Sequence, residues 1–160
     1  MEETIGFVGV GLMGHGMAKN LIEAGYRVTV VAHANRTPVE DLVARGAGEA
    51  STLDQLGAAS SIIHICAPGS PEVETIVSGL MKSMTNGSVI IDCSTSDPIS
   101  TLALAGELKA AGIQLADAPL GGTPVQAEKG ELSTMVGADS DVFDRIKPVI
   151  AAWAQAIVHI

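Results

Sequence analysis

Apolar and polar residues follow two different periods along the chain, and the two periods predict strands and helices in turn. Short continuous apolar runs are typical of strands that are covered on both faces. Apolar residues at helical spacing between these runs, with proline at the start or glycine at the end, predict helices. The predicted strands are Thr4–Val8, Val28–Val31, Ser61–Cys66, Ser88–Ile91, Gln114–Ala118, Leu132–Val136 and Ala156–Ile160. The predicted helices are Leu12–Ala24, Pro38–Arg45, Pro71–Met84, Pro98–Ala111 and Asp141–Trp153.

Strands that alternate with helices favour a mostly parallel sheet with helices on both faces, because parallel strands need a crossover between them. We therefore predict a doubly wound α/β fold. The 160 residues have the length of one domain, and no internal repeat or linker interrupts them. The chain holds 18 glycines and only two Phe, one Tyr and one Trp. Small residues allow helices to lie close to the sheet.

The charge balance excludes several classes of partner. Nine Lys and Arg against 18 Asp and Glu leave a net charge of −9. A chain this acidic lacks the basic face that nucleic acid or an anionic membrane requires, and no apolar run is long enough for a membrane span. The start, Met1-Glu2-Glu3, is acidic where a signal peptide is basic, so we expect a cytoplasmic protein. Cys66 and Cys93 each follow an apolar run, which favours reduced, buried thiols at strand ends.

A glycine-rich turn, Gly9-Val10-Gly11-Leu12-Met13-Gly14, lies between the first predicted strand and the first predicted helix. In this context Gly9 permits a tight turn, Gly11 lets the backbone approach a pyrophosphate, and Gly14 lets the helix pack on the strand. The start of the helix then offers free N–H groups and a partial positive charge to the anion. The pattern predicts a dinucleotide site in which Leu12 and Met13 also take part.

The segment after the second predicted strand indicates which dinucleotide is bound. NAD sites place an acid about 20 residues beyond the glycines, on the ribose 2′-hydroxyl. Here the first acid after the second predicted strand is Glu40, and Arg36 instead offers a charged planar group for a 2′-phosphate. Asn35 and Thr37 add neutral donors. We predict NADP rather than NAD; the alternative is an ordinary exposed arginine in a loop.

Several segments in chain order resemble the β-hydroxyacid dehydrogenases, a family that includes 3-hydroxyisobutyrate dehydrogenase and tartronate semialdehyde reductase. The segments are Gly9–Leu21, Asn35–Thr37, Asp92–Pro98, Asp117–Pro124 and Gly130–Gly137. The resemblance implies a Rossmann fold and hydride transfer between a nicotinamide cofactor and a small β-hydroxyacid or its semialdehyde. It also implies that the whole enzyme is a homo-oligomer.

The resemblance implies roles for individual positions. Ala67 and Pro68 would lie on the adenosine side of the cofactor, with the segment around Glu72 and Val73 nearby. Thr95 would contact both nicotinamide and substrate. The substrate turn would be formed by Gly121, Gly122 and Thr123. For Ser94 and Thr95 a helix cap before Pro98 is an equally good interpretation.

Two departures from the family pattern concern the chemistry. The family has a serine at position 121, which helps to hold the substrate carboxylate, and this chain has Gly121. Thr123 would supply a displaced hydroxyl, or the substrate differs. The family's general acid/base is a lysine in a Gly-x-x-x-Asn-x-x-Lys helix, and that motif does not occur here. We assign no catalytic residue in this chain.

The chain ends inside the apolar run Ala156–Ile160, where natural ends tend to be polar. We expect residues 1–160 to be the cofactor domain, separated from an all-helical catalytic and oligomerisation domain, so that the chain binds cofactor without turnover. Two alternatives stay open: an imine reductase-type NADPH oxidoreductase, against which Asp117-Ala118-Pro119 argues, and a non-catalytic nucleotide sensor.

Overall fold

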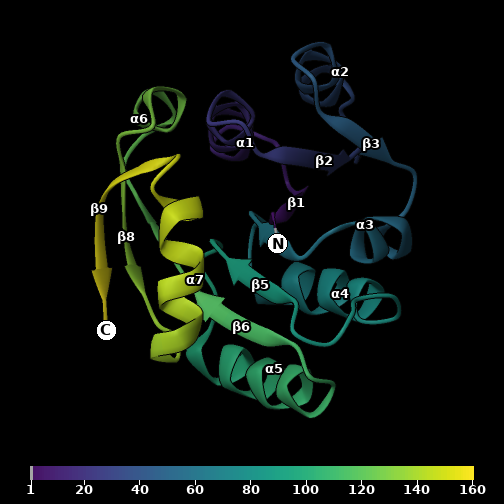
Figure 1. The fold of residues 1–160 in the computed structure, drawn as a ribbon, viewed down its shortest axis with the longest axis vertical. Coiled ribbons are helices and arrows are strands. Elements are labelled where there is room, and N and C mark those ends of the chain that lie inside the picture. The colour runs from purple at the N-terminus through teal and green to yellow at the C-terminus, as the bar shows by residue number, and fades with distance from the viewer. Residues whose placement is uncertain (1) are drawn as a thin grey trace.

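The computed structural model describes residues 2–160, and its centre is a sheet of six parallel strands (Figure 1). The strand order is β3-β2-β1-β4-β5-β6. The bounds are β1 Thr4–Val8, β2 Arg27–Val31, β3 Gly48–Ala50, β4 Ile62–Ile65, β5 Val89–Asp92 and β6 Gln114–Asp117. The doubly wound α/β prediction is confirmed.

Helices cover both faces of this sheet (Figure 1). Their bounds are α1 Gly14–Glu23, α2 Thr37–Ala44, α3 Leu53–Ala59, α4 Ser70–Leu80, α5 Pro98–Ala110, α6 Pro124–Lys129 and α7 Ser140–Ile150. Alternate residues of the central strands enter two hydrophobic clusters. Phe7 belongs to one cluster, together with side chains of α1, α2 and α7, and the next residue, Val8, belongs to the other, together with side chains of α3, α4 and α5. The apolar runs therefore mark strands that are buried on both sides.

A second, three-stranded sheet follows the main one, with the order β7-β8-β9. Its strands are β7 Leu120–Gly121, β8 Leu132–Val136 and β9 Ala154–His159. Asp117 and Gly137 join the two sheets, because each donates its backbone N–H to the carbonyl of the other, over 3.0 and 2.8 Å. These bonds hold the β6 end of the turn between β6 and β7, and the pairing of Leu120 with Thr134 on β8 holds the other end.

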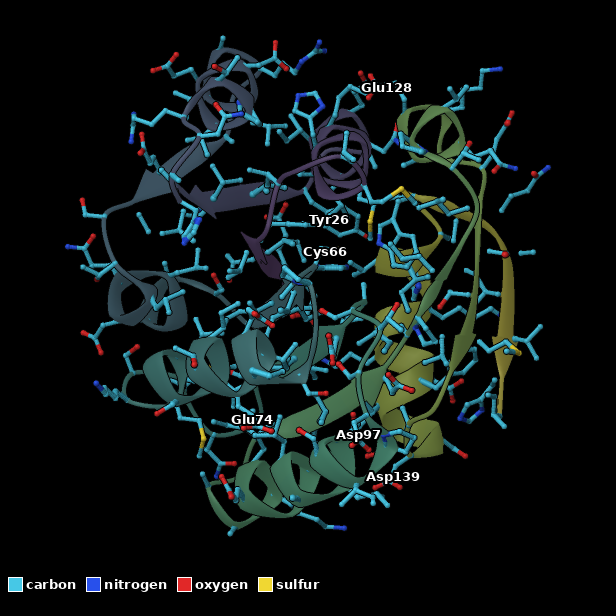
Figure 2. All side chains as sticks on the ribbon, turned by 180° about the vertical axis from the view of Figure 1, so that it is seen from behind. Tyr26, Cys66, Glu74, Asp97, Glu128 and Asp139 are labelled. Carbon is cyan, nitrogen blue, oxygen red and sulfur yellow. The ribbon has the colours of Figure 1, made fainter. Side chains whose placement is uncertain are left out.

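Helix α6 packs directly on α1, the helix that follows the glycine turn. A Cβ placed on Gly16 would lie 2.7 Å from backbone atoms of Ala127 and Glu128, so only glycine permits this approach. The Asn20 amide donates to the carbonyl of Ala127 over 2.9 Å. On the surface Glu128 pairs with Lys19 at 3.2 Å, and Figure 2 shows Glu128 over these two helices. The packing of α1 on α6 therefore fixes the glycine turn relative to the segment after β7.

Several elements differ from the sequence-based expectation. The short elements β3, α3, β7 and α6 were not predicted, and the last strands form a separate sheet. Helix α1 begins at Gly14 rather than Leu12, because the turn occupies the preceding residues. The N-cap of α5 is Asp97, whose carboxylate accepts from the N–H of Ile99 over 2.8 Å, and not Ser94 or Thr95. Within residues 2–160 no helix has the length and apolar character to span a membrane.

Candidate cofactor site

A cavity of about 770 Å³ lies at the carboxyl ends of β1, β2 and β4. In an open parallel sheet this is where ligands bind, since the connections from β1 and from β4 leave to opposite sides of the sheet. Its volume suits a small organic ligand, and its walls are mostly apolar. Five of the predicted cofactor residues line it: Gly9, Gly11, Asn35, Ala67 and Pro68.

The glycine turn forms one wall of the cavity. Gly9 has φ +91°, and a Cβ there would lie 1.9 Å from the carbonyl oxygen of Cys66, so no other residue fits. A Cβ on Gly11 would meet no atom within 4 Å. The backbone of Gly11 is therefore open to a ligand. Leu12 is exposed beyond the turn, whereas Met13 packs partly on the core.

The segment after β2 places a guanidinium beside two acids. Arg36 Nη2 lies 3.0 Å from Glu49 Oε1 on β3, and Arg36 Nε lies 3.8 Å from Glu40 Oε1 on α2. The N–H of Thr37 donates to Asn35 Oδ1 over 3.1 Å, which shapes the start of α2. Sequence reasoning did not identify Glu49, because nothing in the local pattern shows that β3 pairs with β2.

A hydrogen-bond network connects the loops that follow β4 and β5. The buried carboxylate of Asp92 accepts from the N–H of Ser94 over 2.9 Å and from Ser96 Oγ over 2.7 Å. Ser94 Oγ in turn accepts from the N–H of Ala67 over 2.9 Å. Thr95, between the two serines, is exposed. The loop that offers Thr95 is thus held to the cavity wall at Ala67.

Two further polar groups lie at the same edge of the sheet. Burial raises the pKa of the Asp117 carboxyl, and the charge of Asp92, its register partner on β5, raises it further. Burial also raises the pKa of the Cys93 thiol, with a contribution from the neighbouring Cys66 thiol. Both cysteines are free. Cys93 is buried as predicted, whereas Cys66, labelled in Figure 2, is partly exposed and lines the cavity.

The predicted substrate turn lies on the second sheet, outside the cavity. Thr123 is the N-cap of α6 and forms a capping box with Gln126, so its hydroxyl is occupied in the described structure. Ser133 Oγ, on β8, donates to the carbonyl of Gly121 over 3.3 Å. A Cβ on Gly121 would lie 2.5 Å from this hydroxyl. Ser133 therefore occupies the space that a side chain at position 121 would need. Gly122 has φ +132°, a backbone conformation that favours glycine.

Of the two residues that the sequence suggested on helix α4, one lines the cavity and the other is buried. Val73 is buried against the sheet with Val77 and Leu80. Glu72, which the sequence suggested together with Val73, lines the cavity, and so does Ile76. The spacing of Val73, Val77 and Leu80 is a helical core pattern and could have shown that Val73 faces the core. His33 also lines the cavity, on the loop after β2.

The parallel sheet, the open glycine turn and the cavity beside it define a dinucleotide-binding domain of the Rossmann type. Residues 4–160 match the family described as the NAD binding domain of 6-phosphogluconate dehydrogenase. The chain is 39% identical over 149 residues to 2-hydroxy-3-oxopropionate reductase of Escherichia coli, a match that covers 91% of this chain and 50% of that protein. It is also 39% identical over 166 residues to 2-(hydroxymethyl)glutarate dehydrogenase of Eubacterium barkeri, covering 100% and 54%.

A solved structure of a related enzyme has the same fold as this chain. The 3-hydroxyisobutyrate dehydrogenase of Mycobacterium tuberculosis, determined with L-serine, superposes with a TM-score of 0.94 at 26% identity and covers 99% of this chain and 54% of that one. The chain belongs to the β-hydroxyacid dehydrogenase family and corresponds to its N-terminal, NAD(P)-binding domain. It spans about half the length of the curated relatives that it matches.

Proposed function

We propose that the chain binds NADP and serves as the cofactor domain of an oxidoreductase that acts on a small β-hydroxyacid or its semialdehyde. One observation supports this most: the cavity has an open glycine backbone at one end and the Arg36 segment beside it. The first is suited to a pyrophosphate and the second to a 2′-phosphate.

The residues present fit the dinucleotide by their chemistry. The N–H groups at the start of α1 would bind the pyrophosphate, and Gly11 would allow it to approach. Ala67 and Pro68 would bound the adenosine, and Arg36 would bind the 2′-phosphate. Thr95 would lie toward the nicotinamide, with Gly121 and Gly122 toward the substrate. When bound, the nicotinamide would accept a hydride from the hydroxyacid or supply one to the semialdehyde.

Proton transfer would come from outside this chain. No lysine here lies in a Gly-x-x-x-Asn-x-x-Lys segment, and Lys129 ends α6 near the substrate turn without that context. The curated relatives are about twice as long as the chain. We therefore propose that residues 1–160 bind the cofactor and that turnover, and assembly into oligomers, need a further helical domain.

Titration of NADPH and NADH into the 160-residue chain, followed by nicotinamide fluorescence, tests the cofactor assignment. NADPH should bind more tightly, and Arg36→Ala should abolish the preference while leaving NADH binding unchanged. If Arg36→Ala leaves the NADPH/NADH ratio as it was, the NADP assignment is wrong. If neither nucleotide binds, the chain is not a cofactor domain.

Absorbance at the NADPH band tests turnover separately. The chain should not oxidise NADPH in the presence of tartronate semialdehyde, succinic semialdehyde or glyoxylate. Oxidation with any of these would show that the chain contains its own proton donor. Oxidation with a cyclic imine instead would favour an imine reductase.

A further inference from the structure

Arg36 is already paired in the described structure, and both of its partners are acids. Nη2 lies 3.0 Å from Oε1 and 3.3 Å from Oε2 of Glu49, and Nε lies 3.8 Å from Glu40 Oε1. We propose that Glu49 is a specificity-determining residue, which competes with the 2′-phosphate of the dinucleotide for the Arg36 guanidinium. This inference rests on the proposed binding of NADP.

The sheet order brings Glu49 to this place. Strand β3 is the edge strand beside β2, and the register pairs Val30 with Glu49 and Val31 with Ala50. Arg36 follows β2 by a few residues, and its side chain meets Glu49, the middle residue of β3. The side chain of Glu49 is 33% exposed and that of Glu40 is 67% exposed. Water therefore screens the Glu49 pair less, and Glu49 should have the larger effect.

Glu49 should weaken NADPH binding in two ways. To bind a 2′-phosphate with two N–H groups, Arg36 must move Nη2 away from the Glu49 carboxylate. The ion pair between Arg36 and Glu49 is then lost, which makes the free energy of NADPH binding less favourable. The negative charge that remains on Glu49 also repels the phosphate. NADH has a 2′-hydroxyl, which can donate to a carboxylate and has no charge to be repelled. Glu49 should therefore weaken NADPH binding without weakening NADH binding.

Glu49→Gln tests this, because it keeps the shape of the side chain and removes its charge. With the 160-residue chain titrated with NADPH and NADH, the variant should bind NADPH roughly two- to fivefold more tightly, from the usual strength of partly exposed pairs. NADH affinity should stay the same or fall. Glu40→Gln should give a smaller gain, and Glu107→Gln, an equal charge change on the distant α5, should give none. Equal gains in all three variants would contradict a specific role for Glu49.

The Arg36→Ala background separates this inference from the proposed function. With Arg36 absent, Glu49→Gln should improve NADPH binding by a clearly smaller factor, since there is no guanidinium to release and only the repulsion between the Glu49 charge and the phosphate is relieved. A gain that persists in full would show that Glu49 acts by charge alone and would overturn the competition. If Arg36→Ala removes the NADPH preference but Glu49→Gln changes nothing, the inference fails and the NADP assignment stands. If Arg36→Ala itself changes nothing, the NADP assignment fails.

A shorter probe checks that the effect lies at the 2′ position. Adenosine 2′,5′-bisphosphate and adenosine 5′-monophosphate differ only in the 2′-phosphate. Calorimetric titration should show that Glu49→Gln tightens binding of the first by the same factor as NADPH and leaves the second unchanged. A gain for both compounds would place the effect away from the 2′-phosphate and overturn the proposal.

Discussion

The indole Nε1–H of Trp153 donates to Nε2 of His64 over 3.2 Å, in the middle of the hydrophobic core. The ring of His64 also stacks on Phe7, with centroids 5.2 Å apart and planes 3° from parallel. Because Nε2 accepts, the imidazole is neutral with its proton on Nδ1, and Nδ1 has no hydrogen-bond partner among the described residues. Burial lowers the pKa of His64 to about 3.

His64 should make the fold sensitive to acid. Below about pH 6.5 the unfolded chain binds a proton at this residue that the folded chain does not, so the free energy of unfolding falls as the pH decreases toward 3. Between these pH values the free energy of unfolding falls by up to about 1.4 kcal/mol for each pH unit because of His64. Above pH 6.5 this residue causes no loss of stability. Urea unfolding at pH 8, 6.5 and 5.5 measures it. His64→Gln, which keeps an acceptor for Trp153, should show a smaller loss between pH 6.5 and 5.5, and His33→Gln, in an exposed loop, should behave like the wild type.

The glycine turn predicts opposite outcomes for two neighbouring substitutions. Gly9→Ala should prevent folding, because its Cβ would overlap the carbonyl of Cys66. Gly11→Ala should fold with an unchanged melting temperature, because its Cβ meets nothing in the protein. It should nevertheless weaken NADPH binding about tenfold or more, because the methyl group occupies the space of the pyrophosphate. Thermal melts and NADPH titration check both; undiminished NADPH affinity in Gly11→Ala would contradict the placement of the pyrophosphate.

The contact between α1 and α6 can be tested with a matched pair of alanines. Gly16→Ala should lower the free energy of unfolding by about 1–3 kcal/mol, because the methyl group would force α6 away. Gly106→Ala, on the exposed side of α5 with open space at its Cβ, should raise it by about 0.5–1 kcal/mol. Denaturant unfolding measures both values. A neutral Gly16→Ala would mean that α6 is free to shift on α1.

Ser94 should matter for both stability and cofactor binding. Ser94→Ala removes the acceptor of the Ala67 N–H and should cost about 1 kcal/mol of unfolding free energy. Because Ala67 lines the cavity, NADPH affinity should also fall. Ser100→Ala, which loses an exposed contact with Glu74, should change stability by less than about 0.5 kcal/mol. If Ser94→Ala loses stability but keeps its full NADPH affinity, the hydrogen bonds of Ser94 do not position the cofactor site.

The sequence pattern predicted the elements that are buried on both faces, and the structure confirms them. Short runs of buried residues such as Ile62–Ile65 and the glycine turn are strong local signals. The strand Gly48–Ala50 has no such signal, since its place depends on pairing with the edge of β2. For the same reason the pattern did not show that Glu49 meets Arg36. The hydroxyl of Ser133 next to Gly121 likewise depends on an antiparallel pairing that no local period records.

The reciprocal hydrogen bonds between Asp117 and Gly137 have a consequence for how the molecule opens. They fasten the second sheet to the first, while α6 is held on α1 from the other side. Separation of the second sheet would break both sets of contacts, so we expect the chain to unfold as a single cooperative unit. The amide protons of Asp117 and Gly137 should exchange with solvent only at the rate of global unfolding, together with those of the central strands.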